Sequence, residues 1–477
     1  MINLNQGKMR FLFVVILLVG FIRVQAQVSL DLKKCREMAL ENSKKIAIAA
    51  QQVEKSAYDV KSYRANFFPK FSATGMYAYM QKRWKFKING GYLPTYIQDG
   101  QGNLVPNLYL DPTTHLPVMG KDGMFLFNEY AFMPDINLAL GLRGIYTAGI
   151  LLEQPLFMGG KVRSAFRMAK IGKEMADLNQ EYNRKEVILE ADEAYWQYLK
   201  VCELVTSAEK YKSVVKELVL NLVNAYEIGM SSRNDLLKAQ VKLNEAELML
   251  QKAMNGKSLA RMNLCRIVGI DFYSEVQISD TLQEGITPGL FEVKAGITGR
   301  PEYNLLEKEV ELKVKEVELA RSDFLPQLGV SASYGYSDGI TVNGQGSGIS
   351  SFTAMASLKI PIYNWGEGRN KVRSVKAEKE MSRLRQEDMA QMMQLEIARA
   401  RFNVEDAVTR VTLTRQSLSQ AEENLTVSKN QYEVGMETLT DYMEAQAQWQ
   451  KAWSDWIDAK AELRLSETRY LKATGQL

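Results

Sequence analysis

Apolar and polar positions follow a period of two in four separate segments of this chain. Along the third segment, for example, Leu328 and Val330 point to one face while Gly329 points to the other. Because successive side chains of a strand lie on opposite faces of a sheet, this alternation predicts β-strands. The predicted strands span residues 68–80, 137–155, 326–337 and 349–362. A soluble sheet with one buried face shows the same alternation, but long strands with small or polar residues opposite the apolar face are typical of a membrane β-barrel.

Helical spacing dominates the longest segments. Apolar residues recur three or four positions apart over 160–226 and 366–432, and neither stretch contains proline. Gly229 and Gly435 then interrupt the pattern, which resumes after each glycine. The predicted helical hairpins are 160–268, with a turn at 227–234, and 366–474, with a turn at 433–440. The first helix of each hairpin reaches roughly 100 Å at 1.5 Å per residue, so it needs other helices alongside, as in a coiled coil or a helical barrel.

One phrase occurs twice along the chain. "YEIGMSSRNDLLKAQ" begins at Tyr226 and "YEVGMETLTDYMEAQ" begins at Tyr432, an offset of 206 residues. The same offset relates "QPLFMGGKVR" from Gln154 to "IPIYNWGEGR" from Ile360. The chain therefore contains one structural unit twice. The predicted parts are a first repeat at 27–270, a linker at 271–296 and a second repeat at 297–477.

The first repeat carries an insertion that the second repeat lacks. Its strand start at Pro69 matches Pro326 at an offset of 257 residues, which is 51 more than the offset further along. The extra residues fall in a stretch rich in Gly, Pro, Asn and Asp, the composition of turns and loops. We therefore predict a long loop at 81–136 between the first two strands.

The first 26 residues have the pattern of a secretory signal peptide. Lys8 and Arg10 precede an unbroken apolar run from Phe11 to Ile22, and small residues follow. This run is too short to span a bilayer as a helix. Without residues 1–26 the formal net charge falls from +4 to +1, because Lys8, Arg10 and Arg23 are lost. An almost neutral mature chain gives no indication of nucleic-acid binding.

The chain offers little catalytic chemistry. Its single histidine, His115, lies in the predicted loop, so a histidine-based triad or zinc site is poorly supplied. No glycine-rich phosphate-binding loop follows a strand. The three cysteines, Cys35, Cys202 and Cys265, are an odd number and do not suggest a disulfide framework. We predict no enzymatic activity, no metal and no cofactor, so any energy must come from a partner.

The predicted strands cannot complete a barrel within one chain. A closed barrel needs about eight strands, and an open sheet edge is not viable in lipid because its backbone groups lack hydrogen-bond partners. The strands must therefore pair with those of other copies. We predict an obligate oligomer, an α+β membrane protein with a β-barrel at one end and a helical barrel at the other. A trimeric stalk or adhesin and a soluble periplasmic coiled-coil scaffold remain as alternatives.

The chain resembles the TolC-like outer-membrane channels of efflux pumps and type I secretion. The resemblance is carried by the start "SLDLKKCREMALENSKKI", by the strands that begin at Pro69 and Pro326, and by the two pairs of repeated phrases. It implies a homotrimer with a 12-stranded transmembrane β-barrel, four strands per chain, continuous with a long periplasmic α-helical barrel. It also places the linker 271–296 in an equatorial girdle and the loop 81–136 outside the cell.

The same resemblance implies a function. The chain would form the passive outer-membrane exit duct of a tripartite efflux pump, with its helical barrel in the periplasm. It would dock a periplasmic membrane-fusion adaptor and, through it, an inner-membrane RND or ABC transporter, to export small molecules such as drugs. A type I protein secretion channel is the alternative within the family.

The repeated phrase has the chemistry of a turn between two helices. Gly229 and Gly435 supply the left-handed residue that ends the preceding helix. Ser232 and Asp235 have the three-residue spacing of a capping box at the start of the next helix, and the second copy repeats that spacing.

The resemblance also places functional residues at these turns. Asp235, Tyr432 and Asp441 would lie at the closed periplasmic mouth. The residues implied in adaptor docking are Gly229, Met230, Ser231, Gly435, Met436 and Glu437. Family members often carry a basic latch residue where this chain has Glu437. We predict that Arg233 serves instead, by pairing with Glu437 or Asp441.

The two copies of the turn differ in charge. Lys238 follows Asp235 by three residues and can neutralise it on the same helix face. Glu444 occupies the equivalent position after Asp441, where no basic partner is available on that face. We therefore predict that the second copy forms an acidic ring at the mouth, which favours cations and repels anions.

Overall fold

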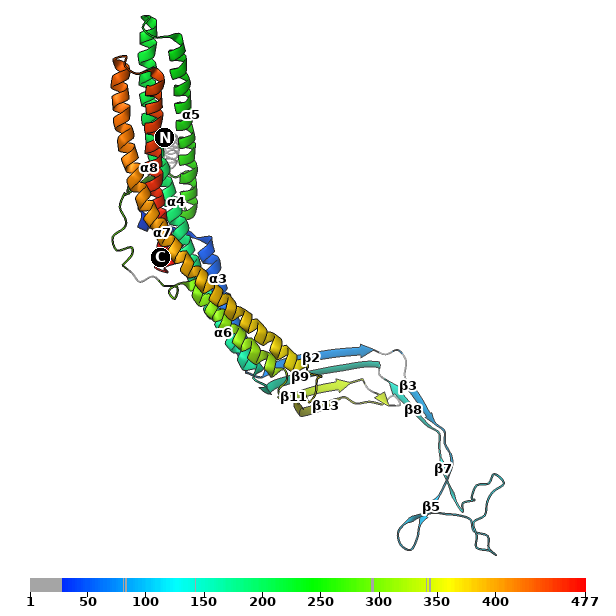
Figure 1. The fold of residues 1–477 in the computed structure, drawn as a ribbon. Coiled ribbons are helices and arrows are strands. Elements are labelled where there is room, and N and C mark those ends of the chain that lie inside the picture. Colours follow the sequence, from blue (N-terminus) through cyan, green and yellow to red (C-terminus); the bar gives the residue numbers. More distant parts are fainter. Residues whose placement is uncertain are drawn as a thin grey trace, which may run out of the picture. The chain divides into compact units, whose positions relative to one another are not determined.

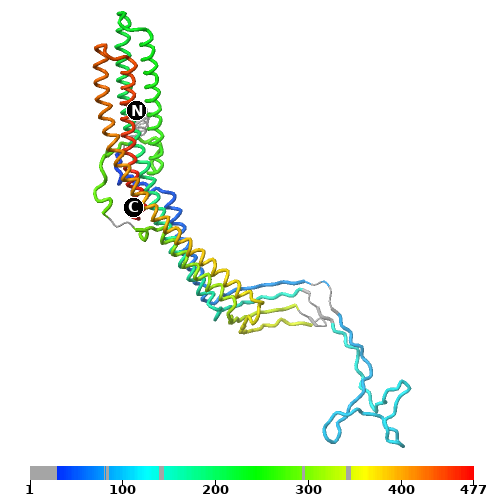
Figure 2. Tube along the Cα trace, viewed as in Figure 1, coloured from blue at the N-terminus to red at the C-terminus, as the bar shows by residue number. Residues whose placement is uncertain are grey.

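A computed structural model shows two compact units, drawn as a ribbon in Figure 1 and as a Cα trace in Figure 2. The described residues are 28–79, 81, 84–141, 143–292, 296–339, 341–342 and 345–477. The predicted signal peptide at 1–26 lies outside them. The helical unit comprises the described residues up to 63 together with 163–320 and 366–477, and the sheet unit comprises 64–162 and 321–365.

Two long hairpins dominate the helical unit. The helices are α2 (Leu32–Asn42), α3 (Lys44–Ala65), α4 (Lys161–Glu227), α5 (Arg233–Val268), α6 (Pro301–Ser322), α7 (Glu367–Glu433) and α8 (Leu439–Ala473). The first helices of the hairpins, α4 and α7, have 67 residues each, and each continues through a short turn into α5 or α8 (Figure 1). None of the helices in the described part of the chain has an apolar stretch long enough to cross a membrane.

Apolar side chains between the helices hold the helical unit together. Tyr195 on α4, Leu264 on α5 and Ile457 on α8 have no exposed surface and belong to one cluster. Another cluster lies near the turns, where Tyr442 packs with Leu218. Full burial of one large apolar side chain contributes about 1.5–3 kcal/mol. Packing between helices therefore stabilises the hairpins more than helix propensity does.

The linker forms a small sheet with the start of the chain. β1 (Val28–Leu30) pairs in parallel with β10 (Val276–Ile278). Just beyond these strands, the Asp280 carboxylate accepts hydrogen bonds from the Leu32 N–H at 3.3 Å and from the Tyr195 hydroxyl at 2.5 Å. These contacts fasten the linker to α2 and α4. Strands of three residues are too short to show a period in the sequence, which indicated only a linker here.

The sheet unit contains a four-stranded antiparallel sheet. Its strands are β2 (Lys70–Tyr79), β9 (Arg143–Met158), β11 (Gln327–Asp338) and β13 (Ile349–Lys359), in the order β13-β11-β9-β2. The register places Ala73, Ile150, Tyr334 and Phe352 in one row across the sheet. Ile150, Tyr334 and Phe352 are 58%, 59% and 70% exposed. Because this face is apolar and open, and β2 and β13 have a described neighbour on one side only, the sheet of one chain is incomplete.

The segment predicted as a loop at 81–136 contains short strands. They are β3 (Trp84–Ile88), β4 (Gly91–Pro94), β5 (Tyr96–Gln98), β6 (Leu104–Pro106) and β7 (Tyr130–Met133), followed by β8 (Ile136–Gly141). β3 and β8 join β12 (Thr341–Val342) in a sheet of order β12-β8-β3, while β4 pairs with β7 and β5 with β6. Brief runs of β-branched and aromatic residues between Gly and Pro favour such strands. The strand predicted at 137–155 is found as two strands, since it includes all but the first residue of β8 and most of β9 (Arg143–Met158).

Candidate functional site at the helix turns

The two turns end α4 and α7 with the same backbone hydrogen bonds. Gly229 N–H donates to the Tyr226 carbonyl at 3.0 Å, and the next N–H, of Met230, donates to the Ala225 carbonyl at 2.8 Å. In the second turn the corresponding distances, from Gly435 and Met436, are 3.1 and 2.8 Å. Both glycines are left-handed, with φ of 79° and 77°. This pattern is a Schellman motif, which satisfies the last carbonyls of each helix.

The next helices begin with side-chain caps. Ser232 Oγ accepts the Asp235 N–H at 3.0 Å, and Thr438 Oγ1 accepts the Asp441 N–H at 3.3 Å. Each hydroxyl also donates to the carboxylate of the same aspartate, at 2.7 and 2.6 Å. In a capping box the acidic side chain usually accepts the backbone N–H of the cap residue, whereas here each carboxylate binds the cap hydroxyl. Each cap hydroxyl is therefore bound to both the backbone N–H and the carboxylate of the aspartate three residues later.

A cleft of about 760 Å³ lies between the two turns. The proposed site residues that line it are Met230, Ser231, Asp235, Tyr432, Gly435 and Glu437. The structure therefore brings parts of both copies of the repeated phrase together. Arg233, Asp441 and Glu444 do not line this cleft.

The two turns differ in charge compensation. Lys238 Nζ lies 3.5 Å from Asp235 Oδ1. Glu444 accepts a hydrogen bond from Gln448 Nε2 at 3.2 Å, and among the described residues neither Glu444 nor Asp441 forms an ion pair. The carboxylates of the second turn are thus uncompensated within one chain.

Tyr432 is the aromatic member of the site. Its ring stacks on Tyr442, with ring centroids 5.3 Å apart and an interplanar angle of 20°. Burial raises the pKa of Tyr432, and the nearby Asp235 and Tyr442 raise it further. The phenol is therefore neutral under ordinary conditions and can donate a hydrogen bond. Sequence reasoning missed Tyr442, although it follows the cap Thr438 by four residues and so lies above it on the same helix face.

The proposed latch residues are not joined within one chain. In the described structure Arg233 has no ion pair or hydrogen bond with Glu437 or Asp441. Glu437 Oε2 is buried and has no hydrogen-bond partner there. A buried carboxylate oxygen without a partner is costly, so Glu437 is in a position to accept a donor from outside the chain.

A buried ion pair that sequence reasoning missed joins three helices. Asp192 on α4 has no exposed surface. It accepts hydrogen bonds from Arg36 on α2, at 2.7 and 2.5 Å, and from the Thr468 hydroxyl on α8, at 3.0 Å. Its partners lie 156 and 276 residues away in the chain, so no local pattern reveals them.

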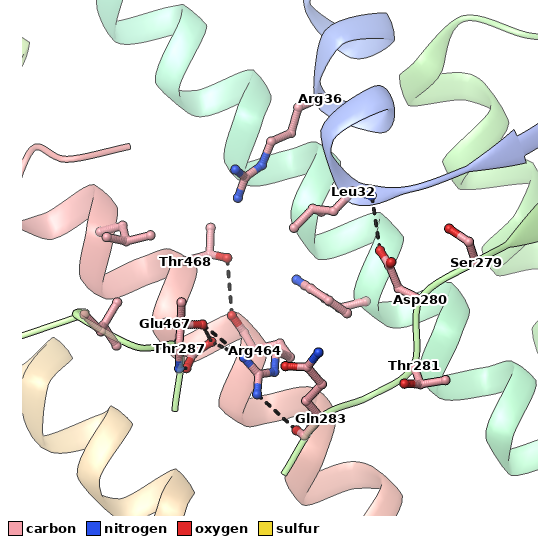
Figure 3. Close-up of a pocket in the computed structure, with 13 residues that line it drawn as sticks. Leu32, Arg36, Ser279, Asp280, Thr281, Gln283, Thr287, Arg464, Glu467 and Thr468 are labelled. Atoms are coloured by element: carbon pink, nitrogen blue, oxygen red, sulfur yellow. Dashed lines mark hydrogen bonds and ion pairs between the residues drawn. The ribbon is translucent and has the colours of Figure 1, made fainter. Parts of the chain in front are cut away.

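A second cavity, of about 560 Å³, lies where the linker meets α2, α4 and α8. Figure 3 shows the Arg464 guanidinium directed at the linker, where it donates to the Gln283 carbonyl and the Thr287 hydroxyl, both at 3.1 Å. The carboxylate of Glu467 accepts from Arg464 at 2.8 Å and from the Thr287 N–H at 2.7 Å. These charged groups bind one another and the linker, which indicates a structural joint.

Known proteins similar to this chain are outer-membrane efflux and secretion proteins. A family model described as "Outer membrane efflux protein" matches residues 131–269 and 299–476. The alkaline protease secretion protein AprF of Pseudomonas aeruginosa is 26% identical over 46% of this chain and 47% of its own length, so the match spans about half of that relative. The outer membrane protein TolC of Vibrio cholerae is 21% identical over 73% of this chain and 83% of its own length.

A solved structure shows the same fold. The CmeC outer membrane channel of Campylobacter jejuni superimposes with a TM-score of 0.68 at 18% identity, covering 93% of this chain and 85% of the channel. This likeness confirms the predicted fold class, in which long helices combine with β-strands. Cys35, Cys202 and Cys265 are free in the structure.

Proposed function

The chain belongs to the outer membrane efflux protein family, and we propose that three copies assemble into one exit duct through the outer membrane. Membership in this family of channels confirms the predicted outer-membrane location and the prediction that the chain is not an enzyme. The coarse function, an outer-membrane efflux or secretion channel, follows from the same membership.

The incomplete four-stranded sheet is the observation that carries the proposal that several copies assemble, and the family resemblance supports three. Its exposed apolar row faces outward without a cover, and its two edges lack partners among the described strands. In lipid the apolar row is stable, but the open edges are not. Pairing β2 of one copy with β13 of the next satisfies both edges. Three copies supply twelve strands, enough to close a barrel.

The long helices support the same assembly. On α7 the apolar residues Leu395, Phe402 and Leu413 are more than half exposed. They are spaced by seven and eleven residues, so they lie along one stripe of the helix. A stripe of this kind fits against another long helix. We propose that it packs against a neighbouring copy in a helical barrel.

We propose that the turns dock a periplasmic adaptor, which connects the duct to an inner-membrane RND or ABC transporter. Met230 and Met436 support this role because their side chains are 81% and 79% exposed at the tips of the hairpins. Flexible, exposed methionines suit an adaptable protein interface. Gly229 and Gly435 close the two turns through their N–H groups, and Ser231 and Glu437 line the cleft between the turns.

Export of small molecules such as drugs is the function that we favour, because the matching family model is described as an efflux protein. Type I protein secretion is the second candidate, supported by the match to a protein named for alkaline protease secretion. Both use a passive duct, and the inner-membrane partner decides between them.

Two residue-level proposals concern the mouth of the duct. Asp441 and Glu444 of three copies form an acidic ring that favours cations, since neither is neutralised within its chain. Arg233 of one copy pairs with Glu437 or Asp441 of a neighbour and holds the mouth closed. The unpartnered buried oxygen of Glu437 supports such a contact between chains.

In-cell crosslinking from the hairpin tips tests the function. A photoreactive residue at Met230 or Met436 should capture an adaptor, and the transporter recovered with it should be an RND or an ABC protein. The same residue at Gln251, in the middle of α5, is the matched control and should capture no adaptor. Recovery of the chain in the soluble periplasmic fraction would contradict the proposal.

A further inference from the structure

The insertion at 81–136 has many apolar side chains exposed on its surface. Sixteen large apolar side chains between residues 84 and 134 are more than one-third exposed. Contiguous exposed apolar patches beyond a few hundred Å² usually mark an interaction site. The family match begins at residue 131, so most of this segment lies outside the residues that the family model matches.

The insertion is an ordered structure with a fixed base. The Asp135 carboxylate accepts the Gly90 N–H at 2.7 Å and pairs with Lys87 Nζ at 2.9 Å. These contacts hold the two chain segments together where the ribbon of β4 and β7 begins. A Cβ at Gly90 would lie 2.1 Å from the Met133 carbonyl oxygen, so the backbones approach too closely for any other residue.

The ribbon of β4 and β7 presents an open aromatic surface. Tyr92 and Phe132 are register partners with ring centroids 5.4 Å apart, and they are 72% and 66% exposed. An isolated two-stranded ribbon is at best marginally stable in water. The exposed aromatic pair therefore needs a covering surface.

Membrane lipid is a poor cover for this segment. Asp99 and Asp111 each organise a turn by accepting backbone N–H groups at 2.7 to 3.0 Å. These N–H donors lower the pKa of both carboxyls, which keeps them ionised. Burying such carboxylates in lipid is costly.

The position of the insertion favours other copies of the same chain as its cover. β3 follows β2 in the sequence, and each is the edge strand of its sheet (Figure 1). In the same way β8 connects to β9 and β12 connects to β11. The order β12-β8-β3 therefore matches the order β11-β9-β2 of the larger sheet. The root of the insertion therefore continues the edge that, under the proposed function, pairs with the next copy. A segment tethered at that seam meets its copies at high effective concentration.

We propose that the insertions of three copies pack against one another through their apolar faces and form a collar beyond the barrel strands. The ribbon of β4 and β7 provides the central contact, with Tyr92 and Phe132 facing a neighbouring copy. This inference rests on the proposed trimer.

Crosslinking between single cysteines tests the collar. A Phe132→Cys variant, treated in its membrane with a short bis-maleimide, should yield covalent dimers, because each chain offers one thiol at this position and each bis-maleimide joins two thiols. A Thr113→Cys variant, in the polar turn after Asp111, is the matched control and should label with a mono-maleimide without crosslinking. The unmodified chain reports any background from its three native cysteines. If Phe132→Cys does not assemble, Tyr92→Cys on the partner strand provides the same test.

Absence of crosslinks at residue 132 in an assembled protein would overturn the collar. Ready labelling by a mono-maleimide would then show an open surface, and protection from it would show lipid or a different protein as the cover. A native mass measurement on the same sample separates the two proposals. A trimer without crosslinks contradicts the collar alone, whereas a monomer contradicts the proposed function.

Discussion

Asp192 is the residue at which α2, α4 and α8 meet. Its carboxylate is fully buried and bound by Arg36 and Thr468, whereas the Arg36 side chain remains 33% exposed. Removing one partner of a buried pair costs about 3–5 kcal/mol, because the other charge is left unpaired. Partial exposure of Arg36 lowers that cost.

The Asp192→Asn variant should therefore be destabilised by about 3 kcal/mol. Thermal unfolding of the detergent-solubilised protein, followed by helical circular dichroism, measures the change. Asp177→Asn is the matched control, because it removes an exposed partner of Lys173 at 2.8 Å. That exposed pair contributes less than about 1 kcal/mol. Equal losses of stability in both variants would refute the structural role of Asp192.

Gly435 tests the backbone chemistry of the turn. Its φ is 77°, and a Cβ there would meet no atom within 4 Å. Gly435→Ala should therefore destabilise the turn only through backbone strain, by about 1–2 kcal/mol. Hydrogen exchange of amides near the turn should accelerate roughly tenfold, since about 1.4 kcal/mol corresponds to that factor.

Gly172→Ala is the control, because it should change the stability in the opposite direction. Gly172 lies within α4 and also has open space at its Cβ position. Alanine there should stabilise the helix by about 0.5–1 kcal/mol. Slower exchange at the turn in Gly435→Ala would show that the left-handed conformation is not required.

Local chemistry was predictable from the sequence, and distant pairing was not. The glycine and capping residues of the turns interact within five positions of one another, so their spacing was sufficient. The partners of Asp192 belong to other helices, and the sequence around residue 192 does not indicate them. Whether the turn residues have the proposed roles in gating and docking remains a prediction.

At the scale of elements, length decided what the sequence could predict. The helices of 67 residues and the strands of ten or more carried enough periods to be recognised. The strands inside 81–136 have three to five residues, which hides their period within a composition typical of loops. The charge difference between the two turns also lies at this scale.

Neutralising the second turn should reduce cation selectivity. In the double variant Asp441→Asn with Glu444→Gln, each copy loses two unpaired carboxylates, so the reversal potential in a planar bilayer under a salt gradient should move toward zero. Asp235→Asn is the control and should have a smaller effect, because Lys238 already compensates Asp235. Unchanged selectivity in the double variant would rule out the acidic ring.

The latch proposal makes a separate prediction at the same turn. Arg233→Ala should raise the conductance of the resting channel, because it removes the donor proposed to bind Glu437 or Asp441 of a neighbouring copy. Glu437→Gln should have a similar effect if Glu437 is the acceptor. A resting conductance equal to that of the unmodified protein in Arg233→Ala would exclude the latch.

At the scale of the whole molecule, a single chain leaves strand edges and apolar surfaces without partners. The sheet leaves two edges open and its apolar row uncovered, and α7 carries an exposed apolar stripe. Assembly with further copies of the same chain would pair these edges and cover the stripe on α7. The family of the chain could be recognised from its sequence because the internal repeat preserves the order of strands and hairpins. The strand count of a barrel requires more than one copy, whereas the choice of three copies rests on the family resemblance and stays a proposal.

The central claim is that three chains close one duct. Native mass spectrometry of the complex extracted from the outer membrane in mild detergent tests it most directly. We predict a single species with the mass of three mature chains, stable in the absence of adaptor and transporter. A folded monomer, or an assembly with a different number of chains, would contradict the account.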